Sequence, residues 1–277
     1  MIVCLRTIWA GLIGALLAGT ATSAAAGWEL RVCADPDNMP FSNQAGDGFD
    51  NKIAVIIARE LGADITWVWL PDTKGRTRQL YVQGGACDMV MGVIDGQPGF
   101  LTSYAYYRTG YVFLYPETAS FRVTNLNDPV LRDLLVGFPG GAAKTVPPSV
   151  ALANRGIVEN QRHFIDKRDP GKDFAPLLEA LGEGKIDLAI AWGPLAGAYA
   201  EARGGMIVAP VKPEIDAPFI PMVASLTIGL RPSDEGLRDD VDLALSRGWD
   251  EIHAVLTEAS VPLIDLPPPA PSVEEGG

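Results

Sequence analysis

The feature that most constrains the fold is a short sequence pattern that occurs twice. Residues 84–92 read GGACDMVMG, and residues 182–193 read GEGKIDLAIAWG. In each copy a segment with helical spacing of apolar residues ends at a pair of glycines, and an Asp then leads into an apolar strand that runs to another Gly. Because each copy would form the third strand of a strand–helix–strand–helix–strand unit, the pattern predicts two lobes of similar design.

The first unit can be followed from its opening strand. Residues 30–34 alternate between apolar and polar side chains, which predicts a strand that ends before Pro36. Asp50 or Asn51 is a suitable cap for the helix that follows. The remaining elements, in order, are a helix over residues 50–61, a strand over 65–70, a helix within 72–82 and a strand over 87–93. This order predicts a parallel sheet with right-handed crossovers.

The second unit begins near residue 122, and the chain then returns to the first unit. The elements expected are strands over 110–115 and 134–138, a helix from 149, a helix over 174–181, a strand over 206–211, a Pro-rich crossing over 213–221, a strand over 225–230, and one or two helices within 237–256. The last helices are amphipathic and would pack back on the first lobe.

The loop after the opening strand is the first candidate for a binding site. Residues 35–43 read DPDNMPFSN and combine hydrogen-bonding side chains with one aromatic ring. Ligands of open α/β sheets bind at such strand ends, although Asp, Asn, Pro and Ser are also ordinary turn formers. The cleft residues expected here are Asp35, Asn38, Phe41 and Asn43.

Other candidates for the cleft are spread over both units, and each has a structural alternative. Arg76 and Arg78 either border the cleft or are solvated charges at a helix start. Tyr106 and Tyr107 either contact a ligand or pack in the interior, and Trp192 is either cleft wall or lobe core. The further candidates are Asn51, Trp69, Arg76, Arg78, Gly92, Asp95, Tyr106, Tyr107, Gly140, Gly141, Thr145 and Trp192.

The Gly-rich segment 139–145, PGGAAKT, does not meet the requirements of a phosphate-binding loop. That motif needs Gly directly before the Lys and another Gly five residues earlier, where this chain has Ala143 and Phe138. A nucleotide site is therefore not expected. The backbone N–H groups at the start of the next helix could still hold a polar group of a ligand.

Both ends of the chain are expected to lie outside the fold. Residues 1–26 contain Arg6, an apolar stretch and three successive alanines, which is typical of a cleaved signal peptide. The mature chain would be exported and not inserted in the membrane. Residues 267–277, PPPAPSVEEGG, predict a disordered tail.

The charge balance excludes one class of partner. The chain has 22 Lys+Arg against 34 Asp+Glu, a net charge of −12. Nucleic acids and anionic membranes bind basic surfaces that neutralise phosphate. Neither is therefore expected as a partner.

The cysteines predict a disulfide rather than a metal site. Without Cys4 of the leader, Cys33 and Cys87 remain, and in an oxidising compartment such a pair favours a bridge. If the first and third strands are neighbours, the two can face each other. His163 and His253 are far apart in sequence, so we expect no metal, no cofactor and no catalytic constellation.

Four stretches resemble one family of binding-protein-like accessory proteins. They are LRVCADPDNMPFSN (30–43), GFDNKIAVIIARELGADITWVWLP (48–71), GGACDMVMGV (84–93) and YAYYRTGYVF (104–113). They are similar to the J proteins, of the MxaJ and XoxJ type, that are encoded beside dehydrogenases dependent on pyrroloquinoline quinone (PQQ). The resemblance implies an α/β fold of the type II periplasmic binding proteins. Each lobe is then a mostly parallel sheet flanked by helices, with two crossover strands, lobe 1 spanning 27–116 plus 222–266 and lobe 2 spanning 117–221.

The resemblance also implies a function, with one alternative. It implies a periplasmic, non-enzymatic protein that assists maturation or activation of its partner, a PQQ-dependent methanol or alcohol dehydrogenase. The alternative is the solute-binding protein of an importer for a small organic ligand. Amino-acid-binding proteins generally carry Thr-x-x-x-x-Arg after the third strand of lobe 1 and an Asp after the matching strand of lobe 2. Residues 93–100, VIDGQPGF, and 191–194, AWGP, lack both, so a standard amino acid is not the expected ligand.

Overall fold

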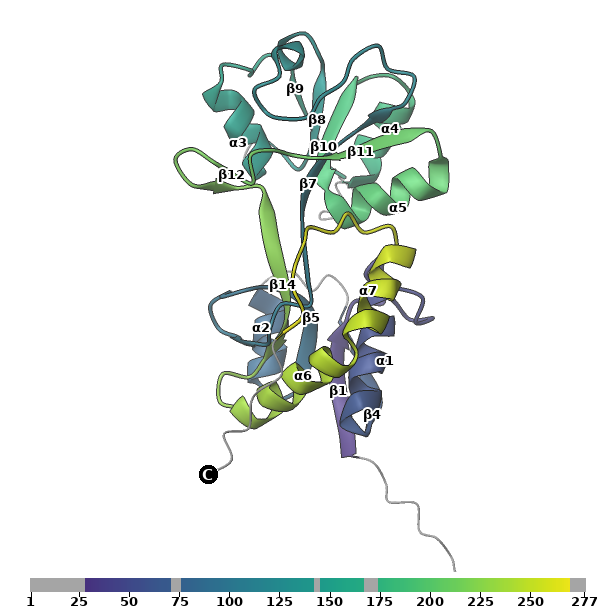
Figure 1. Cartoon of the computed structure of the whole chain (residues 1–277), viewed down its shortest axis with the longest axis vertical. Coiled ribbons are helices and arrows are strands. Elements are labelled where there is room, and N and C mark those ends of the chain that lie inside the picture. Colours follow the sequence, from purple (N-terminus) through teal and green to yellow (C-terminus); the bar gives the residue numbers. More distant parts are fainter. Residues whose placement is uncertain (1–27, 71–75, 142–144, 167–173, 270–277) are drawn as a thin grey trace, which may run out of the picture.

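The computed structural model describes residues 28–70, 76–141, 145–166 and 174–269. The expected signal peptide and the end of the expected tail lie outside these ranges. Within them, no helix combines the length and the apolar character needed to cross a membrane. The chain forms two lobes that follow one another along the longest axis of the molecule and are joined by extended strands (Figure 1).

Lobe 1, the lower lobe in Figure 1, is built on three parallel strands with helices on both faces. The strands are β1 (Trp28–Ala34), β4 (Ala63–Trp69) and β5 (Met89–Ile94), in the order β4–β1–β5. The helices are α1 (Phe49–Leu61), α2 (Arg76–Gln83), α6 (Glu235–Arg247) and α7 (Trp249–Glu258), and the short strands are β2 (Asp37–Asn38), β3 (Ser42–Asn43) and β6 (Leu101–Thr102). Because side chains alternate along a strand, Leu30 and Val32 pack with α1, α6 and α7, whereas Cys33 packs with Val82 of α2.

Lobe 2 repeats the strand order of lobe 1. Its parallel strands are β8 (Val136–Pro139), β9 (Gln161–Phe164) and β10 (Leu188–Trp192), in the order β9–β8–β10. The other elements are a 3-10 helix η1 (Pro129–Arg132), helices α3 (Pro147–Asn154), α4 (Phe174–Gly182) and α5 (Gly193–Arg203), and strands β11 (Met206–Pro210), β12 (Ile215–Asp216) and β13 (Ile220–Pro221). One face buries Leu152 of α3, and the other buries Leu177 of α4 and Ala196 of α5.

Two long strands, β7 (Tyr107–Pro116) and β14 (Val223–Leu230), connect the lobes. The first residues of β7 pair with β14, and the residues from Tyr111 onward pair with β10 and β11. β14 also pairs with β5, so one ten-stranded sheet runs through both lobes. The expected two-lobed, two-crossover α/β architecture is confirmed. The exact boundary residues of the two lobes remain a prediction.

The repeated Asp has the same structural role in both lobes. In lobe 1 the Arg31 N–H donates to Asp88 Oδ2 (2.9 Å), and the Asp88 N–H donates back to the Arg31 carbonyl (2.8 Å). In lobe 2 the Leu135 N–H donates to Asp187 Oδ2 (2.8 Å), and the Asp187 N–H donates to the Leu135 carbonyl (3.0 Å). Each Asp therefore ties the start of the third strand to the first strand, at Arg31 within β1 and at Leu135 directly before β8. The contacts that the two repeated Asp residues share are therefore structural ones with the backbone.

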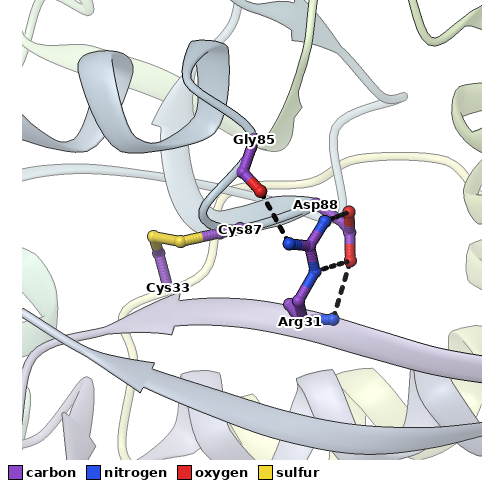
Figure 2. Close-up of a disulfide and its surroundings, with 5 residues drawn as sticks. All are labelled: Arg31, Cys33, Gly85, Cys87 and Asp88. Carbon is purple, nitrogen blue, oxygen red and sulfur yellow. Dashed lines mark hydrogen bonds and ion pairs between the residues drawn. A yellow bond between two sulfur atoms is a disulfide. The ribbon is translucent and has the colours of Figure 1, made fainter.

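The predicted disulfide between Cys33 and Cys87 is confirmed, with a Cα–Cα distance of 5.6 Å (Figure 2). Cys33 lies near the end of β1, and Cys87 lies just before β5, its parallel neighbour. Beside the bridge, the Arg31 guanidinium donates to both carboxylate oxygens of Asp88 (3.1 and 2.6 Å) and to the Gly85 carbonyl (2.6 Å). The disulfide and the ion pair thus reinforce the same junction, the contact between β1 and the start of β5 at Asp88.

Two details of the expected fold are wrong. Helix α1 is capped by Gly48 without a side-chain hydrogen bond, and not by Asp50 or Asn51. Gly48 lies against the preceding loop so closely that a Cβ would meet the Phe41 carbonyl oxygen, and Asp50 donates its N–H to that same oxygen (2.9 Å). The Pro-rich segment 213–221 is not the crossing. It forms the β12–β13 hairpin, and β14 makes the return.

Sequence patterns missed two elements of lobe 2. Strand β9 has partly exposed residues and a polar sequence, QRHF, so it lacks the apolar signature of the other parallel strands. Helix α5 starts directly at Gly193 after β10, with Pro194 in its first turn. Its small residues, GPLAGAYAEAR, carry little apolar periodicity.

Candidate functional site

A cavity of about 280 Å³ lies at the carboxyl ends of β1 and β5. Its walls come from lobe 1, with Trp192 at the end of β10 as the contribution of lobe 2. The sequence-predicted candidates that line it are Asp35, Asn38, Phe41, Asn51, Arg78, Gly92, Tyr107 and Trp192. Lining residues that the sequence analysis did not single out include Ser42, Asp50, Trp67, Met91, Ile94 and Gln97. A ligand-binding role for these residues stays a prediction.

The other candidates lie outside the cavity lining. Tyr106 is buried beneath it, Trp69 stacks behind Trp67 (ring centroids 5.4 Å apart), and Asp95 accepts a hydrogen bond from Thr102 (3.3 Å). Asn43, Gly140, Gly141 and Thr145 do not line it either. The side chain of Arg76 lies outside the described part of the structure. The Gly-rich segment of lobe 2 extends the β8–β9 pairing, because the Gly140 N–H donates to the Phe164 carbonyl (2.7 Å).

The loop after β1 is both a turn and a wall of the cavity. Its backbone closes through the Phe41 N–H and the Asn38 carbonyl (2.9 Å), and Ser42 Oγ donates to the Asp35 carbonyl (2.7 Å). The Asp37 N–H donates to Asp35 Oδ1 (2.9 Å). These internal bonds hold the loop in one shape. The loop is therefore a turn that also lines the cavity, and its role in binding stays a prediction.

A buried carboxyl group lies at the back of the cavity. Asp50 accepts a hydrogen bond from the Tyr106 hydroxyl (3.0 Å), which in turn accepts one from the Gly92 N–H (3.1 Å). Burial raises the pKa of Asp50 to about 7, although the Tyr106 hydrogen bond and the charge of Arg78 lower it. Burial also raises the pKa of Tyr106 far above its ordinary value. Asp50 therefore changes its charge near neutral pH.

Two donors on the cavity wall have few partners. Arg78 of α2 donates a long hydrogen bond to the Met91 carbonyl (3.3 Å). Burial lowers the pKa of its guanidinium, and the negative charge of Asp50 partly offsets this effect. Asn51 is 1% exposed, and its Oδ1 accepts the Asn43 N–H (2.9 Å). Within the described residues, Asn51 Nδ2 has no hydrogen-bond partner. The wall therefore offers unused hydrogen-bond donors.

Aromatic rings form the rest of the wall. Phe41 packs against Phe49 (5.2 Å between centroids), and Trp192 meets Tyr111 edge to face (5.3 Å). Trp67 lines the cavity although only Trp69 was singled out from the sequence. Residues two apart in a strand share a face, so the alternation of β4 could have indicated Trp67 as well.

The described residues contain no group of three or more His, Cys, Asp or Glu side chains that could hold a metal ion. The two histidines lie in different lobes. His163 stacks on Phe138 in lobe 2, and His253 stacks on Trp249 in lobe 1.

Comparison with known proteins identifies the family. No family model matches the chain. It is 30% identical to "Protein MoxJ" of Methylorubrum extorquens over 257 residues, which are 86% of this chain and 82% of that protein. Among solved structures it is similar to MxaJ from Methlophaga aminisulfidivorans MPT (28% identity, TM-score 0.72, 85% of this chain and 100% of that one).

Two further structures define how far the similarity extends. The periplasmic binding protein XoxJ from Methylobacterium extorquens AM1 is 32% identical with a TM-score of 0.69, over 86% of this chain and 100% of that one. An ancestral cationic amino acid solute binding protein is 21% identical (TM-score 0.63, 84% of this chain and 95% of that one) and shares the fold alone. The chain therefore belongs to the MoxJ family and has the two-lobed binding-protein fold of MxaJ and XoxJ.

Proposed function

We propose that this protein is a periplasmic, non-enzymatic accessory factor that assists maturation or activation of a PQQ-dependent methanol dehydrogenase. The observation that carries the proposal is membership of the MoxJ family over most of the chain. The periplasmic location is supported by the description of XoxJ as a periplasmic binding protein and by the signal-peptide pattern of residues 1–26.

The size of the cavity limits how a protein partner could be engaged. About 280 Å³ is small even for a drug-sized molecule. A dehydrogenase would therefore bind to the outer surface. The β12–β13 hairpin of lobe 2 is the first surface to test, because Phe219 is 90% exposed and Ile215 is 63% exposed. Large apolar side chains in such exposed positions are typical of interaction sites.

The test is co-purification from the periplasm of a host that makes the dehydrogenase. Affinity-tagged mature protein is expected to retain the dehydrogenase, and deletion of its gene is expected to lower methanol dehydrogenase activity in periplasmic extracts. Phe219→Ser should weaken retention, whereas Val55→Ser, at an exposed position on α1, should not. If wild-type protein retains no dehydrogenase and deletion leaves the activity unchanged, the proposed function is wrong. Equal retention by both variants would contradict only the choice of surface.

The second candidate function is that of a solute-binding protein for an importer. The cavity, which is lined by both polar groups and aromatic rings, favours it, as does the fold shared with amino-acid-binding proteins. The same experiment separates the two candidates. A protein that purifies without the dehydrogenase but with a bound small molecule, and whose loss abolishes uptake of that molecule, would be a transport receptor.

A further inference from the structure

We propose that the cavity of lobe 1 binds a small organic carboxylate, whose oxygens accept hydrogen bonds from Arg78 and from Asn51 Nδ2. The inference concerns the cavity alone and holds whichever macromolecule the protein serves. It rests on the donors that the fold leaves unused at this site, on the charge of Arg78 and on the aromatic residues of the lining.

Asn51 supplies the first argument. Asn51 is almost completely buried on α1 and is one of the residues that line the cavity. The Asn43 N–H occupies Oδ1 at 2.9 Å, which fixes the orientation of the amide, and Nδ2 has no partner among the described residues. A buried donor that makes no hydrogen bond costs about 1–3 kcal/mol. Such an orientation is explained if a ligand supplies the missing acceptor.

Arg78 supplies the second argument. A guanidinium carries five N–H donors, and the only hydrogen bond recorded for it among the described residues is the 3.3 Å contact with the Met91 carbonyl. Within that part of the chain it forms no ion pair. A positive charge removed from water is costly unless an anion pairs with it. The fork of the guanidinium matches the two oxygens of a carboxylate.

One oxygen of each carboxyl group in the cavity already has a donor within the fold. Asp50 Oδ1 accepts the Tyr106 hydroxyl, and Asp35 Oδ1 accepts the Asp37 N–H. The unused hydrogen-bonding capacity is thus mainly that of donors. A cationic ligand would leave these donors unpaired and would be repelled by the guanidinium. A carboxylate supplies the missing acceptors and would compete for the charge of Arg78 with the carboxyl groups of Asp50 and Asp35.

The remaining wall indicates an apolar body for the ligand. Phe41 and Trp67 come from lobe 1, and Trp192 comes from lobe 2. Flat apolar walls suit an aliphatic or aromatic group of modest size. Because Trp192 comes from the other lobe, a ligand held by Arg78 would contact both lobes.

The test is titration calorimetry of the mature protein with matched small molecules. The panel consists of acetate, propionate, benzoate and phenylacetate, with benzamide as the neutral isostere, benzylamine as the cation and inorganic phosphate as an anion without an apolar body. We expect at least one carboxylate to bind saturably, and to bind at least roughly tenfold more tightly than its neutral counterpart.

Two variants test the donors, and one serves as control. Arg78→Gln removes the charge, and Asn51→Asp removes the donor while keeping the acceptor that Asn43 needs. Each should weaken carboxylate binding roughly tenfold or more. Arg59→Gln, on the exposed face of α1 where Arg59 pairs with Glu251, should leave it unchanged. Circular dichroism confirms that each variant is folded.

Several outcomes overturn the proposal. It fails if no carboxylate of the panel binds at millimolar concentration, if benzamide or benzylamine binds as tightly as benzoate, or if phosphate alone binds. It also fails if both folded cavity variants bind like wild type. If Asn51→Asp is unstable, Asn51→Gln tests the same position. It keeps the donor but moves it, and it is also expected to weaken carboxylate binding.

Discussion

The two lobes share one strand order and one Asp-based junction, but they differ in how that junction is reinforced. In lobe 1, Asp88 also pairs with the Arg31 side chain (2.6 Å) and lies 3.4 Å from Arg231, next to the Cys33–Cys87 bridge. In lobe 2, the recorded contacts of Asp187 are those with the backbone of Leu135. The reinforced junction belongs to the lobe that forms nearly all of the cavity, and Cys33 itself lines it.

The difference shows which parts of the site are fixed. The cavity floor at the end of β1 is held by a covalent bond and an ion pair, and its Asp50–Tyr106 hydrogen bond is fully buried. Lobe 2 contributes Trp192 through the end of β10, where the described residues form no disulfide. Lobe 1 is therefore the covalently reinforced side of the cavity, and lobe 2 adds Trp192 to its lining.

Removing the disulfide should give the largest effect. The bridge spans 54 residues of sequence, and closing a loop of this size stabilises a fold by about 4 kcal/mol in the chain-entropy model. We expect the Cys33→Ala/Cys87→Ala variant to lose stability of this order, measured by urea unfolding. Hydrogen exchange should locate the loss in β1 and β5 rather than in β8 and β10. A uniform loss over both lobes would contradict the view of lobe 1 as separately reinforced.

The buried carboxyl group should give the next largest effect, and it should depend on pH. The pKa of Asp50 is raised from 3.8 to about 7 by burial, so the folded state holds this proton more tightly than the unfolded state. Its contribution to stability therefore falls as pH rises from about 4 to about 7. Asp50→Asn should be more stable than wild type at pH 8, by on the order of a few kcal/mol, and nearly equal to it at pH 4.

Thermal unfolding at several pH values measures this difference. The groups that face Asp50 are Tyr106, Tyr107 and Arg78, and none of the three is expected to change its charge across that range. Asp95→Asn, at an exposed position after β5, is the control and should not alter the pH dependence. A stability gain that is the same at pH 4 and pH 8 would show that Asp50 is not the titrating group.

The architecture could be predicted from the sequence because the sequence patterns that indicate it are local and occur twice. The apolar third strands, the glycine pairs and the two Asp residues predicted the repeated unit, and the neighbouring strands brought Cys33 and Cys87 together. Apart from the two-residue strands, the elements that sequence patterns missed are those with weak periodicity, β9 and α5. The position of a polar or small-residue segment is decided by tertiary packing, which a single sequence does not display.

The site was predicted only in outline, for a similar reason. Asp35, Asn38 and Phe41 follow a strand end, and the general rule for open sheets was sufficient to find them. Asp50 was interpreted as a helix cap because its position in sequence fits that role. Its side chain is buried and accepts a hydrogen bond from Tyr106, which is 56 residues away along the chain. Pairings of this range are set by the sheet register rather than by any local pattern.

The smallest expected effect is the difference in stability between variants of the two repeated Asp residues, Asp88 and Asp187. Asn retains one acceptor for the backbone N–H of Arg31 or Leu135, so Asp88→Asn and Asp187→Asn remove mainly the charge. Asp88 has its pKa lowered by Arg31 and Arg231 although burial opposes this. Because Arg31 is partly exposed to solvent, we expect a loss of about 1–2 kcal/mol for Asp88→Asn and about 0.5 kcal/mol or less for Asp187→Asn in urea at pH 7.

Lowering the pH adds an internal control to this pair. The carboxylate of Asp88 stabilises the fold above its unfolded pKa, and this contribution is lost as pH falls through the folded pKa. The difference between wild type and Asp88→Asn should therefore shrink in acid, while that for Asp187→Asn should stay small throughout. Equal losses at pH 7 would mean that the backbone contacts common to both lobes carry the whole effect, and that the ionic contacts of lobe 1 add no stability.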